Sequence, residues 1–489
     1  MDWVDKLIDG HDGALTAIID ESGHRIDYRT LRRETEDCDA ALIAAGVRAG
    51  DRVMLVAENS PLIAPVLLAC ARLRAWCVPV NARLTAAELD ALREHAKPRV
   101  TIFTNIVSPD AAAHARRLRA KAGPPVMNRQ LTYLSDLSAK PEPVGKTPQT
   151  QPMLLIYTSG TTGAPKGVML SHASVLWNAR TAAEMRAMGP GDELLLTIPG
   201  THIMALATGY LAALQSGAAV RLMTRFSIEG ALKGLAEGAT IFSVVPQVYR
   251  LLLDRIEAGT PLVAPRLRQI GCGGAPLDPG LKARVEAAFG LPLHNGYGMT
   301  EAGPGIASTT MGPRREDGSV GYGFPGCELR VDNPGEDGVG ELQVRGPNVM
   351  LGYFRDPVAT AQAITEDGFL RTGDLARLDP DGSVHLAGRS KELIIRSGFN
   401  VYPAEIETLL LTCPGVLQAA VAGRPAQDNE EVLAFVTTDG STDAATIKRF
   451  LDDRVAAYKR PQIVTIVPAM PLNANGKILK AELIAGLGS

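Results

Sequence analysis

The sequence predicts an α/β protein with a large N-terminal domain of α/β subdomains that includes a small β unit, followed by a smaller α+β C-terminal domain. From Tyr28 to about Thr101, helical patterns alternate with short apolar runs, as in strand–helix–strand units of a parallel sheet. Between Gly335 and Gly388, short alternating strands are separated by Gly, Asp and Pro turns. The chain has 489 residues, longer than one core usually grows, so at least two domains are expected.

The N-terminal part contains the expected strands Arg52–Ala57 and Ala75–Val80. Residues 139–152 are rich in Pro and polar residues, which is typical of a surface connection. A buried strand, Met153–Tyr157, is expected next. We expect the connection to join two subdomains.

The later strands are short and lie between turn residues. In the β unit we expect Gly340–Val344, Ala376–Leu378 and Ser383–Leu386. Beyond Gly388 we expect the strand Leu393–Ile395, a helix that begins at Pro403, and the strand Val416–Val421. We therefore divide the chain into an N-terminal domain, residues 1–388, and a C-terminal domain, residues 389–489.

The composition excludes several classes of partner. Lys and Arg total 50 against 53 Asp and Glu. The resulting formal net charge of −3 gives no strong positive electrostatic field that would attract nucleic acid or anionic lipid. Six scattered cysteines without a C-x-x-C motif indicate free thiols in a reducing compartment. The N-terminus lacks a secretory pattern, and the apolar stretches Ile63–Ala71 and Ile203–Leu214 are interrupted or too short to span a bilayer. We expect a cytoplasmic protein without a membrane span.

The segment Leu154–His172, LLIYTSGTTGAPKGVMLSH, is expected to bind phosphate. Glycines let backbone N–H groups approach an anion, hydroxyls donate hydrogen bonds, and a lysine adds positive charge. One Gly-x-x-Gly alone would indicate a polar turn, but nine consecutive positions here suit phosphate. Walker A spacing, G-x-x-x-x-G-K-[ST], is absent, so ATP would bind to another fold. The expected phosphate contacts are Thr158, Ser159, Gly160, Thr161, Thr162, Gly163 and Lys166.

This loop resembles that of the adenylate-forming superfamily, which includes acyl- and aryl-CoA synthetases, adenylation domains of peptide synthetases, and beetle luciferases. Further motifs of the superfamily recur in order along the chain. They are GCGGAPL at Gly271–Leu277, NGYGMTE at Asn295–Glu301, LRTGDLA around Asp374, GRSKELI from Gly388 and PLNANGKILK at Pro471–Lys480. The chain is identified as a member of this superfamily, with bacterial acyl- or aryl-CoA ligases as the most similar group, which implies ATP, Mg²⁺ and coenzyme A.

The resemblance also implies the nucleotide contacts. Tyr297 would stack on adenine, consistent with an aromatic face beside a purine; a core-packing tyrosine is the alternative. Asp374 would accept hydrogen bonds from the ribose hydroxyls, and Arg389 would be a second contact; for Asp374 the alternative is a turn carboxylate after Gly373. The motif residues assigned to ATP or AMP are Gly274, Ala275, Pro276, Asn295, Gly296, Tyr297, Gly298, Met299, Asp374 and Arg389.

Glu301 is the expected magnesium ligand, because a hard cation favours carboxylate oxygen and would neutralise phosphate charge as pyrophosphate departs. Thr300 would help to hold the phosphate, and both residues are predicted to be catalytic. The alternative for Glu301 is an exposed carboxylate that caps a helix.

The acid pocket is less specifically encoded. His202, in PGTHIMALATG, matches a histidine that relatives place at the edge of the pocket, although Gly200–Thr201 differs from the bulkier apolar pair of many relatives. A histidine satisfied by nearby backbone is the alternative. Segments Ser243–Val248 and Gly298–Gly305 are expected to form other walls. They contain no Arg or Lys, which favours a mostly apolar acyl or aryl acid over a dicarboxylate.

The C-terminal domain is expected to carry Lys477, which would bridge the attacking carboxylate and the α-phosphate. By spacing alone Lys480 is an equal candidate, and the motif selects Lys477. Lys391 matches the family hinge, so the domain would be mobile between an adenylating pose and a thioester-forming pose. In the second pose, Ser397, Gly398 and Phe399 would form the CoA tunnel. Some relatives have a lysine where this chain has Ile395, so no role is transferred to that position.

These parts predict an AMP-forming acid–thiol ligase with two half-reactions on one site. An acid and ATP give acyl-AMP and pyrophosphate, and acyl-AMP then reacts with CoA to give the thioester and AMP. A free-standing enzyme that loads a carrier protein would share every motif. A luciferase-like oxidation and a non-catalytic nucleotide-binding regulator are weaker alternatives, the latter because Lys166, Glu301, Asp374, Arg389 and Lys477 are all present.

Overall fold

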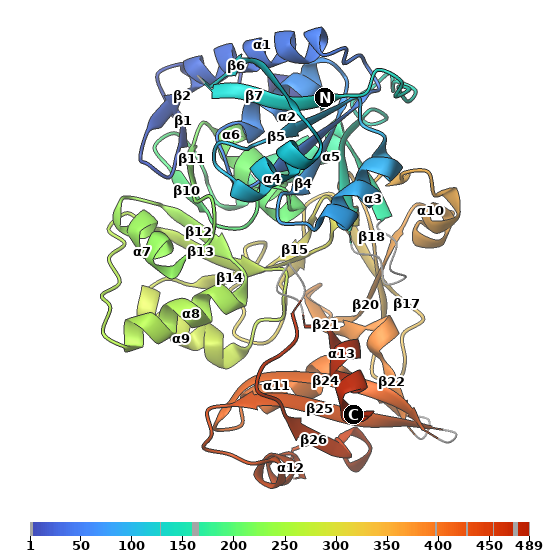
Figure 1. Ribbon diagram of the computed structural model, residues 1–489. Coiled ribbons are helices and arrows are strands. Elements are labelled where there is room, and N and C mark those ends of the chain that lie inside the picture. The colour runs from blue at the N-terminus through green and yellow to red at the C-terminus, as the bar shows by residue number, and fades with distance from the viewer. Residues whose placement is uncertain are drawn as a thin grey trace.

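The computed structural model describes residues 3–127, 129–158, 166–396, 399–426, 429–452, 454–472 and 478–488. A large N-terminal domain holds two extended sheets and a smaller four-stranded sheet, and a small C-terminal domain lies below them in Figure 1. The predicted α/β class, with a large and a small domain, is confirmed. The expected strands all occur within one or two residues of their predicted starts, except that Ala376–Leu378 is the end of a longer strand, Leu370–Leu378.

The first large sheet has eight strands and a buried parallel centre. Strand β3 is buried at all six positions, because α2 residues pack with one face and α3 and α4 residues with the other, which explains its nearly continuous apolar run. The strand order is β19 (Gly352–Tyr353), β9 (Lys166–Ser171), β8 (Pro152–Thr158), β4 (Trp76–Asn81), β3 (Arg52–Ala57), β5 (Val100–Phe103), β7 (Arg129–Ser135) and β6 (Lys121–Val126). Its helices are α2 (Ile63–Arg72), α3 (Ala86–Ala96) and α4 (Pro109–Arg117).

The connection at residues 139–152 does not join two subdomains, contrary to the sequence-based expectation. It runs from β7 to β8, which are strands of the same eight-stranded sheet. Its backbone is tied to that sheet by the Glu142 N–H, which donates to the Gly50 carbonyl at 2.9 Å. After this connection the chain reaches the second sheet, which also contains the early strands β1 and β2, only beyond β9 and α5.

The second large sheet has nine strands, and β1 at its far side pairs in parallel with β11, about 200 residues later. The strand order is β16 (Tyr322–Gly323), β15 (Gly305–Ser308), β14 (Leu293–Gly298), β13 (Gln269–Gly273), β12 (Ile241–Val244), β10 (Glu193–Leu196), β11 (Ala219–Leu222), β1 (Thr16–Ile19) and β2 (Arg25–Asp27). The associated helices are η1 (Val4–Lys6), α1 (Tyr28–Ala44), α5 (His172–Met185), the π-helical η2 (Met204–Leu211), α6 (Ala212–Ser216), α7 (Ile228–Ala236), α8 (Pro246–Glu257), α9 (Pro279–Phe289) and η3 (Thr300–Ala302).

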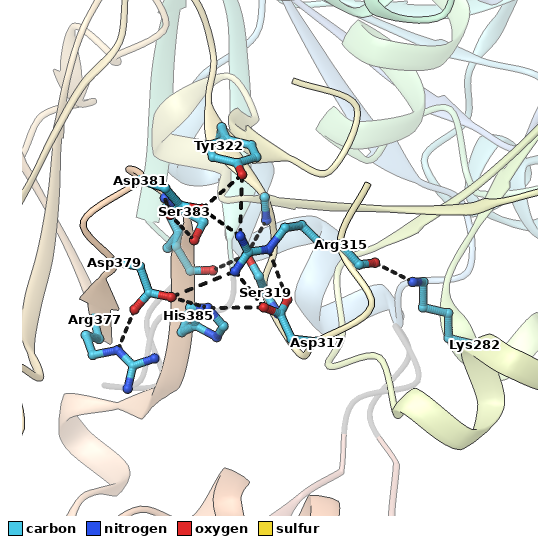
Figure 2. A network of polar contacts seen from close by, with 12 residues as sticks. Lys282, Arg315, Asp317, Ser319, Tyr322, Arg377, Asp379, Asp381, Ser383 and His385 are labelled. Atoms are coloured by element: carbon cyan, nitrogen blue, oxygen red, sulfur yellow. Dashed lines mark hydrogen bonds and ion pairs between the residues drawn. The ribbon is translucent and has the colours of Figure 1, made fainter. Parts of the chain in front are cut away.

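The small β unit is a four-stranded antiparallel sheet. It contains β17 (Glu328–Asp332), β18 (Gly340–Arg345), β20 (Leu370–Leu378) and β21 (Val384–Arg389), beside α10 (Pro357–Ala363). A polar network holds its β20–β21 turn against the loop between β15 and β16 (Figure 2). At its centre, Arg315 pairs with Asp317 at 2.6 Å and with Asp381 at 2.7 Å, and His385 Nε2 lies 2.9 Å from Asp379. The network therefore fixes the hairpin that carries Asp374 and Arg389.

The C-terminal domain has its own core beneath a three-stranded sheet. Its elements are η4 (Ser390–Glu392), β22 (Ile394–Arg396), β23 (Phe399–Val401), α11 (Pro403–Leu411), β24 (Val416–Ala426), β25 (Asn429–Thr438), α12 (Ala444–Asp452), η5 (Ala457–Lys459), β26 (Ile463–Ile466), α13 (Lys480–Ala485) and η6 (Gly486–Gly488). Contacts between described residues that join it to the large domain in this pose include three hydrogen bonds: Tyr402 Oη donates to Asp337 at 3.3 Å, Arg250 Nη1 donates to the Leu417 carbonyl at 2.8 Å, and Ser390 Oγ donates to the Gly373 carbonyl at 3.1 Å.

Two predictions about the whole chain can be compared with the structure. All six cysteines are unpaired. No helix in the described part of the chain is long and apolar enough to cross a bilayer.

Candidate active site

A cavity of about 870 Å³ lies beside the carboxyl ends of β12, β13 and β14, where the nine-stranded sheet meets the β unit and η4. Ligands of open α/β sheets bind outside the carboxyl ends of their strands. One end of the cavity is lined by motif residues predicted to bind the nucleotide. The other end, which we call the acid end because the predicted acid-pocket residues line it, continues between the sheet and the residues of α5 and η2 that cover it.

At the nucleotide end, β8 and β9 bring Thr158 opposite Lys166. The predicted phosphate contacts Ser159, Gly160, Thr161, Thr162 and Gly163 lie outside the described residues. Both flanking elements are strands of one hairpin, whereas a Walker A loop leads into a helix, so the local fold agrees with the exclusion of that motif. Lys166 lines the cavity, and its Nζ lies 4.9 Å from the centre of the Tyr353 ring.

Glu301 and Thr300 line the same end, in the short helix η3 that follows β14. Tyr353 Oη donates to Glu301 Oε1 at 2.9 Å, and the Met350 N–H donates to the Glu301 carbonyl at 2.9 Å. Oε2 of Glu301 has no partner among the described residues. Glu301 therefore lines the cavity, with one carboxylate oxygen positioned by a tyrosine and the other available to a ligand.

These residues fit Mg²⁺ in one particular way. The described residues contain no group of three or more His, Cys, Asp or Glu side chains that could form a protein-only metal site. Mg²⁺ is usually bound by one or two carboxylates together with substrate phosphates and water. Glu301 supplies one such carboxylate, and its partner Tyr353 also lies beside Lys166, one of the residues predicted to contact the phosphates.

Tyr297, Asp374 and Arg389 form a hydrogen-bonded triad. Asp374 and Arg389 are directly opposite each other on β20 and β21. Tyr297 Oη donates to Asp374 Oδ2 at 2.6 Å, and Arg389 Nε lies 2.9 Å from Asp374 Oδ1. Burial, foremost, and the adjacent carboxylate raise the pKa of Tyr297, so its hydroxyl stays a donor at neutral pH. Sequence analysis predicted three separate nucleotide contacts, and the structure brings them into one group.

The other nucleotide motif residues are divided between the cavity and its edge. Gly274, which has φ +78°, lines the cavity, whereas Ala275 and Pro276 are exposed on the loop that leads to α9 and are not part of the lining. The residues of β14 and the following turn that line the cavity are Asn295, Gly296, Gly298 and Met299. Asn295 is held by its N–H, which donates to Thr309 Oγ1 at 2.8 Å.

The floor of the acid end is made of small residues. A Cβ added at Gly271 would come within 3.0 Å of Ser243 Oγ, and one at Gly273 would come within 3.0 Å of the Gly296 carbonyl. A larger residue at either position would require these neighbours to shift, the Ser243 side chain in the first case and the Gly296 backbone in the second. From above, the η2 residue Met204 closes on this floor, with its sulfur 3.6 Å from the position of a Cβ at Gly273. Glycines and the apolar side chain of Met204 therefore both border this part of the cavity.

His202 lines the cavity immediately before η2. Its Nδ1 accepts the Met204 N–H at 3.3 Å, so the two interpretations made from the sequence coexist: the ring faces the cavity and is also satisfied by backbone. The protein that surrounds the ring lowers the pKa of His202, so the imidazole is neutral at pH 7. A neutral ring can shape the pocket without adding charge to it.

The predicted walls also line the cavity, through Ser243, Val244 and part of 298–305, and no Arg or Lys comes from them. A different part of the chain contributes a charged side chain to the lining. Arg186, directly after α5, lines the acid end together with Gln269 and His294. Sequence analysis missed these three residues because they lie in no motif, and only the fold brings them together. Tyr353, the partner of Glu301, was missed for the same reason.

The predicted residues of the C-terminal domain are only partly described. Lys477, Ser397 and Gly398 lie outside the described residues; Phe399 begins β23, opposite Arg396. Lys391, in η4 at the junction of the domains, lines the cavity. Lys480, the alternative by spacing, is ion-paired with Glu392 at 2.5 Å and with Glu407 at 2.8 Å. Burial alone would lower the pKa of Lys480, but these two carboxylates outweigh it and raise the pKa.

Comparison with known proteins identifies the family. The chain matches the AMP-binding enzyme family over residues 9–354 and the AMP-binding enzyme C-terminal domain over residues 405–477. It belongs to the AMP-binding enzymes.

Curated relatives and solved structures agree with this assignment over nearly the whole chain. The chain is 35% identical to a feruloyl-CoA synthase of Amycolatopsis sp, over 94% of both chains. It is 33% identical to an indoleacetate–CoA ligase of Aromatoleum aromaticum, over 99% of this chain and 97% of the relative. Its fold matches the ATP-bound MatB structure from Rhodopseudomonas palustris with a TM-score of 0.86 at 30% identity, covering 99% and 98% of the two chains. The family and these relatives confirm the predicted class of enzyme, an AMP-forming acid–CoA ligase.

Proposed function

We propose that this chain is an ATP-dependent carboxylic acid–CoA ligase that acts on an acid with an aryl or apolar acyl frame. In the first half-reaction, a carboxylate oxygen attacks the α-phosphorus of ATP, the bond to pyrophosphate breaks, and acyl-AMP forms. In the second, the sulfur of CoA attacks the acyl carbon, AMP leaves, and the thiol proton passes to solvent. Feruloyl and indoleacetyl groups, named for two relatives, are flat and suit the glycine-floored space.

The observation that carries this proposal is the continuity of the two ends of the cavity. The polar end is lined by Tyr297, Arg389 and Glu301, with the buried Asp374 bonded to the first two, and the other end is mostly apolar. The ends meet at the turn after β14. A carboxylate entering from the acid end would therefore reach the α-phosphate of a nucleotide held at the polar end, which is the proximity that adenylation requires.

Each residue has a proposed role in this scheme. Lys166 and the loop before it would hold the phosphates, Asp374 the ribose, and Tyr297 the adenine. Glu301, positioned by Tyr353, would hold Mg²⁺, which when bound supplies positive charge against the departing pyrophosphate. Thr300 would contact phosphate.

The C-terminal domain, proposed as residues 389–489, would supply the remaining groups by rotating about Lys391. Lys477 would stabilise the adenylation transition state in one pose. In the other pose, Ser397, Gly398 and Phe399 would border the CoA thiol. What supports such a rotation is the position of Lys391 in η4, the short element through which the chain passes from one domain to the other.

The test uses purified protein with ATP, Mg²⁺, CoA and a panel of aryl, short-, medium- and long-chain acids. We expect acid-dependent pyrophosphate release and acyl-CoA formation with no carrier protein. Thioester formed only after a phosphopantetheinylated carrier is added would instead identify a carrier-loading enzyme. No pyrophosphate release across the panel would contradict catalysis and favour a nucleotide-binding regulator.

A further inference from the structure

The acid end of the cavity holds a positive charge without an acidic partner. Arg186 follows the last residue of α5, and its Nη1 donates to the backbone carbonyl of Thr208 in η2. No described carboxylate forms an ion pair with it. A guanidinium has five N–H donors, and this is its one hydrogen bond to a described residue.

The protein positions Arg186 firmly despite leaving its charge uncompensated. Arg268 donates to the Arg186 carbonyl at 2.9 Å and to the Ala187 carbonyl at 3.0 Å, and its guanidinium is itself anchored on Asp192 at 2.7 Å. Desolvation lowers the pKa of Arg186 to about 10, so the side chain remains protonated at neutral pH. A desolvated charge without a counter-ion is unfavourable, and a ligand anion would relieve it.

Two further polar side chains line the same end. Gln269 begins β13, and its Oε1 is buried without a hydrogen-bond partner in the structure. His294 lies on β14 opposite Gly271, and burial, foremost, lowers its pKa, so the ring is neutral at pH 7. The side-chain amide of Gln269 can turn its NH₂ group toward the cavity, and the neutral imidazole of His294 can donate one N–H. Arg186, Gln269 and His294 together form a donor cluster.

The strands set the distance between this donor cluster and the reaction centre. His294 and Gly298 are four residues apart on β14, which corresponds to about 13 Å along a strand. The predicted nucleotide contacts run from Asn295 to Met299, with Gly298 at the carboxyl end of β14, whereas His294 lies near its amino end. A carboxylate that reacts beside the turn after β14 would therefore be separated from the donor cluster by roughly the length of a substituted aryl ring or a C8 chain.

Building on the proposed ligase function, we propose that the substrate carries a second anionic group, a carboxylate or sulfonate, at the end of its apolar frame, and that Arg186 with Gln269 and His294 binds it. This revises the expectation from the two wall segments alone, which favoured an acid without a second charge. Arg186 would be a specificity-determining residue that contacts the substrate away from the reacting atoms.

The test compares acids that differ only in the distal group: octanoate with octanedioate, and cinnamate with 4-carboxycinnamate. The measured quantity is kcat/KM for pyrophosphate release, expressed as the ratio of diacid to matched monoacid. We expect the wild type to favour the diacid by at least about tenfold in one pair, since a buried charged site discriminates strongly against an analogue that leaves it unpaired. Arg186→Met should lower that ratio by about a hundredfold, and Arg186→Lys by less.

Arg255→Met is the matched control, because Arg255 is an exposed arginine on α8 that pairs with Glu229 outside the cavity. The ratio of kcat/KM for the diacid to kcat/KM for the matched monoacid should be the same in Arg255→Met as in the wild type. Efficient ligation of monoacids by the wild type, with no preference for either diacid, would overturn this inference and leave the ligase function intact. A preference for 4-hydroxycinnamate over 4-carboxycinnamate would also overturn it, in favour of a neutral acceptor.

Equilibrium binding gives a readout that does not depend on turnover. Calorimetric titration of octanedioate should show at least tenfold tighter binding to the wild type than to Arg186→Met. If no acid supports pyrophosphate release, the ligase proposal fails, and this titration still decides the role of Arg186. Equal or undetectable binding to both proteins would contradict the anion site.

Discussion

The two ends of the cavity differ in how their charges are compensated. At the nucleotide end, Asp374 is held by both Tyr297 and Arg389, and Glu301 is held by Tyr353. At the acid end, the hydrogen bond from Arg186 goes to a backbone carbonyl, and no described carboxylate pairs with it. On the proposed assignment, the first end would be pre-organised for a nucleotide, whose charges are the same with every acid. The second would leave its charge for the substrate to compensate, so we expect discrimination between acids there.

The most severe test of this division is Lys477→Ala, which removes a charge proposed to act at the boundary between the two ends. Pyrophosphate release should fall by orders of magnitude, since deletion of a positioned electrostatic group costs several kcal/mol of transition-state stabilisation. Chemically prepared acyl-AMP supplied with CoA should still give thioester at a rate within about tenfold of the wild type. A folded variant in which both half-reactions collapse equally would argue against domain alternation.

Glu301→Gln should have the next largest effect. The change keeps the shape of the side chain and removes the charge proposed to bind Mg²⁺, so adenylation at saturating ATP should fall by about a hundredfold and need more Mg²⁺. Tyr353→Phe is the matched control, which removes only the hydrogen bond to Oε1 and should cost about tenfold or less. Removal of Mg²⁺ by a chelator should abolish adenylation in the wild type and in both variants. Unfolding midpoints that drop in parallel with activity would indicate a structural carboxylate instead.

Asp374→Asn tests whether the triad serves the nucleotide alone. Loss of the carboxylate charge leaves Arg389 without its ion pair, and we expect the KM for ATP to rise by about tenfold while the ranking of acids stays the same. Tyr297→Phe should raise the KM for ATP by a smaller factor than Asp374→Asn does. Steady-state kinetics with at least four acids provide the measurement, and a reordered acid ranking would show that the two ends are not independent.

His202→Ala should produce the opposite pattern. The ring faces the acid end, so its removal should change relative kcat/KM among acids by a fewfold, with the KM for ATP nearly retained. An unaltered ranking would favour the alternative in which His202 only satisfies backbone through the Met204 N–H.

The smallest expected effect is that of pH on the acid ranking. Burial lowers the pKa of His202 and His294 below the usual value of about 6.5, so the neutral form of both rings predominates as pH falls from 8 to 6.5, and the protonated form predominates only in more acidic solution. Relative kcat/KM values for a diacid and its matched monoacid should therefore be constant over that range. A change in their ratio between pH 8 and 6.5 would mean that one imidazole is charged in the complex.

The same contrast explains what could be predicted from the sequence. Residues 295–301 are contiguous because one strand and its turn carry them, so a short motif was enough to predict that Tyr297 and Glu301 share a site. Arg186 directly follows α5, whereas Gln269 and His294 lie on β13 and β14, and no local pattern links the three residues. For the fold, periodicity predicted individual strands but not their order. Strand order depends on long-range pairing, which is why the connection at 139–152 was placed between subdomains and not within one sheet.

The ion pairs of Lys480 have a consequence for chemical durability. An acyl adenylate is an acylating agent, and an amine can be acylated only in its deprotonated, nucleophilic form. Glu392 and Glu407 raise the pKa of Lys480 and so keep that nitrogen protonated. If the chain generates acyl-AMP as proposed, this lysine near its C-terminus is therefore shielded from acylation by the enzyme's own intermediate.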